Sequence, residues 1–482
     1  MPWQWKRNRA HLSVDRMTLL PLLVLLSSTV PKPPQAKYVF LFIGDGMGLA
    51  QVALTEAYRS SVAGDTLGFQ PLSFSEFPVL GMATTHCVNR RITESAAAAT
   101  AFATGSKASD GSLGLDPHDN TPLRTIAEDA LAQRRGIGIL TTTSIDHATP
   151  AAFYAHVTNR NHYYEIGAAL TRSGMDVFAG GSFRDPHDHT SKTPRESVWS
   201  LARKAGYDVV RGRAALAARK ERKVLAFASP AARDSAIPYE IDRSRGSSDQ
   251  PRLVDFVRET SRLLEGPDGF FVMAEGGKID WACHRNDARS QIEEVLGLDS
   301  AVRSALDFAK KHPGEVLIVV TADHETGGLS LGNGRLGYQS NFGLLRHQRA
   351  SQETIEDSLL ALLSRGDSSL ATHLALVARE TGLATAPGLE LTGQDSAALL
   401  EAHRSSLKPG AKGPWGSYHP LAWTATRVMS DKAGVGWTTL AHTAIPVPVY
   451  AWGAGAEAFR GRMDNTDLAK RLRKAMGISA VP

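Results

Sequence analysis

Short runs of consecutive apolar residues recur along the chain. The first is Tyr38–Ile43 (YVFLFI), and similar runs occupy residues 138–142, 175–179, 270–273, Val316–Thr321 and 447–450. Apolar runs without alternation are typical of parallel strands that are buried on both faces. Stretches with helical spacing separate them, over residues Ser95–Thr104, 121–134 and 290–311. Strands that alternate with helices predict an α/β fold, with a large, mostly parallel sheet sandwiched between helices.

The pattern changes between residues 336 and 432, where polar and helix-forming stretches replace the apolar runs. We expect an insertion or cap near the face that carries the chemistry, because strand-like sequence resumes after it. Residues 190–255 are similarly irregular and are expected to be a second peripheral excursion. The remaining pattern predicts one catalytic domain over residues 37–482.

Residues 1–36 resemble a targeting segment followed by a proline-rich linker. Basic residues up to Arg16 precede an apolar run over residues 19–26, and prolines follow at 31–34. This order is that of a secretory signal peptide and predicts export to the periplasm or the outside. A buried strand or a short membrane anchor is the alternative, but the run is too short to span a bilayer comfortably. We therefore expect no membrane span in the mature chain.

Composition limits the classes of partner. The 482 residues are 42% hydrophobic and 21% charged, which is ordinary for a globular protein, and the formal net charge is +5. Lys/Arg runs interleaved with aromatic residues are absent from the sequence, so a nucleic acid is not expected as a specific partner. The two cysteines, Cys87 and Cys283, are too few for a disulfide framework; they either pair or are two buried thiols.

Acidic, imidazole and hydroxyl side chains follow four of the predicted strands. In chain order they are Asp45, then residues 146–149, then Glu275 with Asp280 and His284, and then Asp323 with His324. Open parallel sheets bind ligands outside the carboxyl ends of their strands, so these side chains are expected to converge. Imidazole with carboxylate suits zinc, whereas oxygen ligands alone suit magnesium. The sequence therefore predicts a metal site at this edge of the sheet.

Two pairs strengthen the metal prediction. Asp280 and His284 are four residues apart, one helical turn, so both can face one ion. Asp323 and His324 are adjacent at a strand-to-loop turn. The alternative for a single pair, an aspartate that caps a helix beside a surface histidine, is favoured in isolation. This alternative becomes less favoured than a metal site when several such pairs follow the ends of predicted strands.

Ser95 is the candidate nucleophile and Arg160 the candidate phosphate ligand. Ser95 stands where an alanine-rich helix is expected to begin, and a helix N-terminus favours negative charge. A plain N-cap serine is an equal alternative on local sequence. The planar guanidinium of Arg160 can bond two phosphoryl oxygens, although an isolated arginine after a helix is more often a surface residue.

These residues lie in motifs that resemble the alkaline phosphatase family, in the family's order from Tyr38 onward. The motifs are IGDGMG with Asp45, TESAA with Ser95, DHATPAAFYAHVTNR with Thr149 and Arg160, EGGKIDWACH with Glu275, Asp280 and His284, VTADHETGG with Asp323 and His324, and GWTTLAHTAIPVPVYAWG with His442. The segment MDNTD at 463–467 is also similar to the family's C-terminal region.

The resemblance implies two zinc ions and one magnesium ion per chain. By resemblance, one zinc takes Asp280, His284 and His442; the second takes Asp45, Asp323, His324 and the free Ser95 oxygen; the magnesium takes Asp45, Thr149 and Glu275. It further implies hydrolysis of phosphate monoesters, in which Ser95 attacks phosphorus and water then hydrolyses the phosphoserine. A homodimer is implied by analogy alone.

Three residues depart from the family's usual pattern and are expected around the site rather than in it. His147 stands where some members have an aspartate that helps hold magnesium, so it should bind magnesium less directly. Glu94 replaces an aspartate that braces the arginine, and its longer side chain is expected to reach Arg160. Trp281 replaces a basic or imidazole residue near the phosphate, which should weaken phosphate binding.

Two other functions are consistent with the same residues. A phosphodiesterase or phosphonate hydrolase of the wider superfamily would share the metal core, although an arginine that grips free phosphoryl oxygens favours monoesters. A non-catalytic protein that binds metal or phosphate is the other alternative, and the presence of every expected ligand argues against it.

Overall fold

The computed structural model describes residues 35–189, 193, 195–408 and 414–478. The predicted signal peptide lies almost wholly outside these residues. Among the described residues, the helices are all too short or too polar to cross a membrane.

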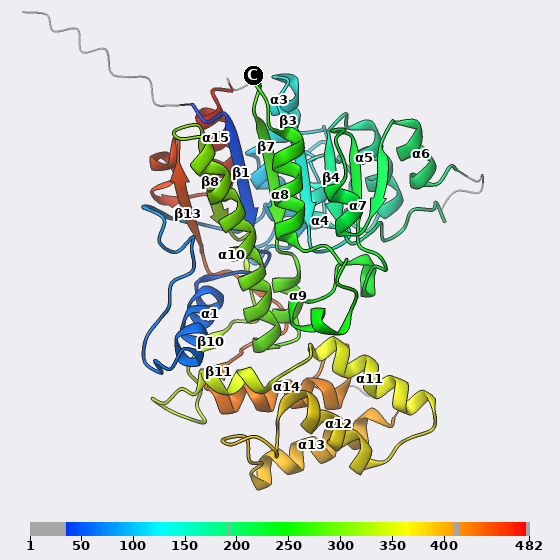
Figure 1. Ribbon diagram of the computed structural model, residues 1–482, viewed down its shortest axis with the longest axis vertical. Helices are drawn as coiled ribbons and strands as arrows, with labels where there is room; N and C mark the ends of the chain where they lie inside the picture. The colour runs from blue at the N-terminus through cyan, green and yellow to red at the C-terminus, as the bar shows by residue number, and fades with distance from the viewer. Residues whose placement is uncertain (1–34, 190–192, 194, 409–413, 479–482) are drawn as a thin grey trace, which may run out of the picture. The chain divides into compact units, whose positions relative to one another are not determined.

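A ten-stranded sheet forms the centre of the fold, with the order β14-β2-β13-β8-β1-β7-β3-β4-β6-β5 (Figure 1). Its strands are β1 (Tyr38–Ile43), β2 (Val79–Ala83), β3 (Gly136–Thr141), β4 (Val177–Gly180), β5 (Asp208–Arg211), β6 (Val224–Phe227), β7 (Phe270–Glu275), β8 (Val316–Thr321), β13 (Val447–Gly453) and β14 (Gly461–Met463). Only β13 runs antiparallel to its neighbours. The mostly parallel α/β sheet that the apolar runs predict is confirmed.

Strands β1, β7 and β8 lie side by side, and each of their residues is buried. This explains why their sequences are apolar without alternation. The expectation that residues 190–255 are peripheral is wrong, because β5 and β6 lie in this segment and extend the main sheet. Both strands are only four residues long. Strand β6 (VLAF) is apolar and buried, whereas β5 carries exposed charged residues at both ends and forms no apolar run.

Helices surround the sheet, and in Figure 1 α8 and α10 cross in front of its central strands. The helices outside the later insertion are α1 (Leu49–Val62), α2 (Ser95–Thr104), α3 (Ile126–Ala132), α4 (Ala148–Ala151), α5 (Tyr163–Arg172), α6 (Val198–Lys204), α7 (Arg213–Ala217), α8 (Leu253–Leu264), α9 (Lys278–His284), α10 (Ala288–Lys311) and α15 (Asn465–Met476). The helix expected over 121–134 is shorter, because the Thr125–Glu128 capping box starts it at Ile126.

The segment at 336–432 is helical and has its own hydrophobic cluster. It contains the 3-10 helix η3 (Phe342–His347) and the helices α11 (Gln352–Ser364), α12 (Leu370–Thr381), α13 (Gly393–Ser406) and α14 (Pro420–Ala433). Buried residues such as Ile355, Leu399 and Leu421 form a cluster separate from the one around the sheet. Two short antiparallel strand pairs, β9 (Glu325–Thr326) with β12 (His442–Thr443) and β10 (Ser330–Leu331) with β11 (Val435–Gly436), flank the segment.

The register of the central strands places their carboxyl ends in one row. Ile43 at the end of β1 pairs with Glu275 of β7 and with Thr321 of β8, and Glu275 pairs with Thr141 of β3. The loops that follow these strands therefore begin side by side, although they come from distant parts of the sequence.

Candidate functional site

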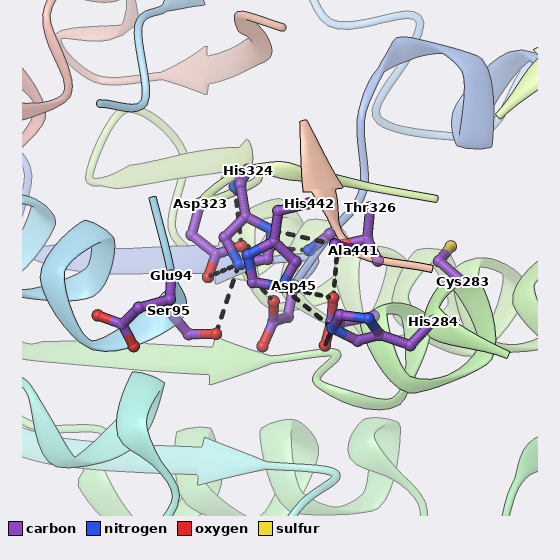
Figure 2. Close-up of polar contacts among 12 residues, drawn as sticks. Asp45, Glu94, Ser95, Cys283, His284, Asp323, His324, Thr326, Ala441 and His442 are labelled. Atoms are coloured by element: carbon purple, nitrogen blue, oxygen red, sulfur yellow. Dashed lines mark hydrogen bonds and ion pairs between the residues drawn. The ribbon is translucent and has the colours of Figure 1, made fainter. Parts of the chain in front are cut away.

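Residues from these loops meet in one buried group (Figure 2). Asp45 follows β1, Asp323 and His324 follow β8, and β12 brings in His442 through its pairing with β9. Ser95, the first residue of α2, faces the same group. The predicted convergence of these residues is present in the structure.

The first cluster surrounds the Nε2 atom of His324. This atom lies 3.4 Å from Asp45 Oδ1, 3.3 Å from Asp323 Oδ2 and 3.4 Å from Ser95 Oγ. Ser95 is 3% exposed, and the other three side chains are wholly buried. Three oxygen atoms from three elements therefore approach a single imidazole nitrogen.

Thr326 fixes the tautomer of His324. Its hydroxyl donates a hydrogen bond to Asp280 Oδ1, and its oxygen lies 3.2 Å from His324 Nδ1. Because the hydroxyl hydrogen is already used, Thr326 accepts from Nδ1–H. The lone pair on Nε2 then points at the oxygens of Asp45, Asp323 and Ser95, an arrangement that calls for a cation between them.

In the second cluster, too, imidazole Nε2 atoms face a carboxylate. Asp280 and His284 lie one turn apart on α9, with Asp280 Oδ2 3.2 Å from His284 Nε2, and His442 Nε2 lies 3.1 Å from His284 Nε2. The Nδ1 atoms of His284 and His442 lie 2.6 and 2.8 Å from the carbonyl oxygens of Leu440 and Thr93. A carbonyl can only accept, so both Nδ1 atoms carry hydrogen and both Nε2 atoms turn toward Asp280 and each other.

A third group is richer in oxygen. Ligand atoms of Asp45, His147 and Glu275 lie within 4.8 Å of one another, and Thr149 is wholly buried on the neighbouring helix α4. The hydroxyls of Thr141 and Thr143 both donate to Glu275 Oε2. His147, expected outside the ligand set, therefore stands closer to Asp45 and Glu275 than the sequence indicated.

The electrostatics require positive charge. Burial, reinforced by nearby carboxylates, raises the pKa of Asp45 well above its usual range and that of Asp323 to about 8. Both oxygens of Asp45 and Oε1 of Glu275 lack a hydrogen-bond donor among the described residues. Burying several carboxylates without counter-charge is strongly unfavourable, so these atoms fit metal ions as ligands. By its donor set, this group of residues could hold metal ions.

The pKa of His284 is also raised, but for a different reason. Burial alone would lower the pKa of this imidazole, but the adjacent Asp280 carboxylate raises it to about 9. In the absence of metal, a proton on His284 Nε2 can therefore satisfy Asp280. Protons and metal ions compete for this cluster, as is usual for metal ligands.

Glu94, rather than Ser95, caps helix α2. The carboxylate of Glu94 accepts hydrogen bonds from the backbone N–H groups of Ala96, Ala97 and Gly111, at 2.7 to 2.9 Å. Ser95 is thus free of the capping role that the sequence left open. Its hydroxyl is directed at His324 instead.

Arg160 is held on two sides. Its Nη1 atom donates to Glu94 Oε2 at 2.6 Å, and its Nη2 atom lies 3.1 Å from His147 Nε2. Burial by itself would raise the pKa of Glu94, but Arg160 and the backbone amides lower it. Burial lowers the pKa of His147 to about 3, with the charge of Arg160 acting in the same direction, so its ring is neutral and can accept from the guanidinium. Glu94 does reach Arg160, as its length suggested.

The helical segment at 336–432 contacts the turn that follows His284. Arg285 bonds Glu356 at 2.9 Å, lies 3.5 Å from Glu353, and stacks on Tyr418 at 4.6 Å. Asp287 accepts from Gln348 Nε2 and from the Gln352 backbone, both at 2.8 Å. No local sequence pattern indicates this support for α9, because the partners are more than 60 residues away.

Other side chains of interest lie near the ligand clusters or are buried elsewhere in the fold. The ring of Trp281 meets that of His147 edge-on at 6.0 Å. Thr326 and Thr141, which hold ligand side chains, were not singled out from the sequence, although Thr326 lies within the VTADHETGG motif. Cys87 and Cys283 are free and buried.

Comparisons with known proteins agree on one family. A family model described as alkaline phosphatase matches residues 36–478. Alkaline phosphatase 3 of Bacillus subtilis is 30% identical over 455 residues, covering 92% of this chain and 89% of the relative. The crystal structure of Thermus thermophilus alkaline phosphatase is 27% identical with a TM-score of 0.77, covering 96% of each chain. A mutant alkaline phosphatase of the Antarctic bacterium TAB5, with Mg bound in its M3 site, is 25% identical with a TM-score of 0.63, covering 93% of this chain and all of the other.

Proposed function

Because this chain belongs to the alkaline phosphatase family, we propose that it hydrolyses phosphate monoesters to an alcohol and inorganic phosphate through a phosphoserine at Ser95. The names of its relatives support a phosphoric monoester hydrolase. The observation that carries the proposal is the position of Ser95 Oγ, buried 3.4 Å from His324 Nε2 in a group of acidic and imidazole ligands.

The residues fit two zinc ions and one magnesium ion. Asp280, His284 and His442 would hold one zinc, Asp45, Asp323 and His324 the second, and Asp45, Thr149 and Glu275 the magnesium, with His147 beside it. The inward Nε2 lone pairs of the three histidines favour zinc, and the oxygen-rich third group favours magnesium. The Mg in the M3 site of the Antarctic relative supports a third ion. When bound, the zinc ions supply Lewis-acid stabilisation of the attacking and departing oxygens.

In the proposed reaction, Ser95 attacks the substrate and Arg160 orients it. Ser95 Oγ loses its proton and attacks phosphorus, the bond from phosphorus to the ester oxygen breaks, and that oxygen leaves as the protonated alcohol. Water then hydrolyses the phosphoserine, which releases inorganic phosphate and restores the hydroxyl. Arg160, oriented by Glu94 and His147, donates two hydrogen bonds to phosphoryl oxygens and stabilises their growing charge.

Rates on a nitrophenyl phosphate monoester and on the matching diester test the proposal. A monoester presents three unesterified oxygens and a diester only two, so the monoester can satisfy Arg160 and still offer an oxygen to the metal ligands' side of the site, and it should react much faster. A faster diester would instead identify a phosphodiesterase of the same superfamily. A zinc-loaded sample that hydrolyses neither ester would identify a non-catalytic protein that binds metal or phosphate.

We further propose that residues 37–482 act as one catalytic domain, that the protein is exported, and that it forms a homodimer. The first rests on the contacts that join the 336–432 segment to Arg285 and Asp287. The second rests on the signal-like order of residues 1–36. The third rests on family analogy, and light scattering tests it.

A further inference from the structure

A cavity of about 600 Å³ is lined by two segments that lead to the candidate site, and none of the candidate metal ligands lines it. One wall is the segment 84–91, which leaves the carboxyl-end edge of the sheet after β2. The opposite wall contains Ala444 and Pro446, which follow His442. Just beyond these walls, His442 Nδ1 lies 2.8 Å from the Thr93 carbonyl oxygen, so the two segments meet at the cluster of Asp280, His284 and His442.

The charge on these walls is positive. Arg90, Arg91 and Arg462 line the cavity together with His86, and no carboxylate lines it. Arg90 pairs with Asp110 at 3.1 Å. The side chains of Arg91 and Arg462 make no hydrogen bond or ion pair among the residues that the structure describes, although the backbone of Arg462 lies in β14, which is paired with β2. Two guanidinium groups without a side-chain partner among the described residues therefore line one cavity.

We propose that this cavity binds a second phosphoryl group on the leaving alcohol, so that the preferred substrates are bisphosphorylated small molecules. The inference rests on the proposed function, since it assigns the cavity to the part of the substrate that departs. The cavity walls approach the His442 cluster along the chain, because Ala444 lies two residues after His442 and Arg91 lies two residues before Thr93, the hydrogen-bond partner of His442.

The chemistry of the walls favours phosphate. Two free guanidinium groups match the double charge of a phosphoryl group, and the fork of each can bond two of its oxygens. Nucleic acid is disfavoured, because no Phe, Tyr or Trp lines the cavity to stack on a base. A carboxylate offers half the charge and engages one fork rather than two.

The test compares three sugars that share a 6-phosphate: glucose 6-phosphate, glucose 1,6-bisphosphate and 6-phosphogluconate. At low ionic strength we expect kcat/KM for the bisphosphate to exceed that for glucose 6-phosphate about tenfold, beyond the factor of two from its second reactive group. The preference should shrink with added salt, because exposed charges are screened. Phosphogluconate should gain clearly less than the bisphosphate.

Substitutions assign the effect to the cavity. The double variant Arg91→Gln, Arg462→Gln should bring the bisphosphate preference close to twofold. Arg172→Gln, which removes an exposed guanidinium that does not line the cavity, should leave basal activity and the preference unchanged. A wild-type preference of twofold or less, an equal gain with phosphogluconate, or a preference that survives in the double variant would overturn the inference. Nitrophenyl phosphate is assayed beside them: no turnover there contradicts the proposed function, whereas turnover without the preference contradicts only this assignment.

Discussion

Glu94 Oε2 and Arg160 Nη1 lie 2.6 Å apart, and the same carboxylate caps helix α2. One side chain thus caps the helix that begins at Ser95 and holds the guanidinium of Arg160. Glu94 therefore links the proposed nucleophile to the proposed phosphate ligand.

We expect Glu94→Gln to lower kcat/KM roughly 10- to 100-fold, because a neutral amide holds the guanidinium less firmly where charge develops. Glu94→Asp is the matched control, since aspartate keeps the charge and is a good N-cap. Steady-state kinetics on nitrophenyl phosphate measure both variants, and circular dichroism checks the fold. Equal losses in the two variants would show that the exact length of the acid matters more than its charge.

His147→Asp should tighten magnesium binding about tenfold, because carboxylate oxygen is a better ligand for magnesium than imidazole nitrogen. The ring lies within 4.8 Å of ligand atoms of Asp45 and Glu275, so the new carboxylate would join this group. Magnesium titration of the zinc-loaded protein, followed by melting temperature, gives the affinity. His147→Asn separates the effect of charge from that of size, and an equal gain with asparagine would contradict the account.

Trp281→Lys should tighten inhibition by inorganic phosphate about tenfold, the effect of one added charge-assisted hydrogen bond. Trp281 directly follows the ligand Asp280, and its ring contacts His147. If product release limits turnover, kcat should fall in the same variant. Trp281→Phe keeps an aromatic ring and serves as the control. A phosphate inhibition constant that is the same in wild type and the lysine variant would be evidence against a phosphate near this position.

Arg285→Gln should weaken zinc binding about tenfold, because side chains that orient a metal ligand typically contribute on this scale. Arg285 follows His284 and is held by Glu356, Glu353 and Tyr418 from the helical segment. Competition with a chromophoric chelator measures the affinity. Arg233→Gln removes a second guanidinium from the same Glu356, at 3.1 Å, without touching the turn after His284. Equal zinc affinities in the two variants would argue that Arg285 has no special role.

The sequence predicts the central strands, in which every residue is buried. Strands β1, β7 and β8 are buried on both faces, so their composition alone identifies them. Strand β2 was missed because its residues alternate between buried and exposed, and β5 because its ends are exposed and charged. Neither forms the continuous apolar run that marks the central strands.

The same division holds in the site. Ligand candidates such as Asp45 and His324 were identifiable, since they follow strands and lie in motifs. The hydrogen bond that orients His324 through Thr326, and the support of Arg285 by Glu353, depend on how distant segments pack. No local pattern encodes such contacts, so they become visible only in the fold.

Metal content and activity of Ser95→Ala test the central claim most directly. The account predicts about two zinc ions in the variant as in the wild type, because the two histidine clusters remain intact, together with loss of monoesterase activity to near background. A variant that binds zinc but still hydrolyses nitrophenyl phosphate at the wild-type rate would contradict the assignment of Ser95 as the nucleophile. A wild-type enzyme that keeps its activity after all zinc has been removed would contradict the metal site itself.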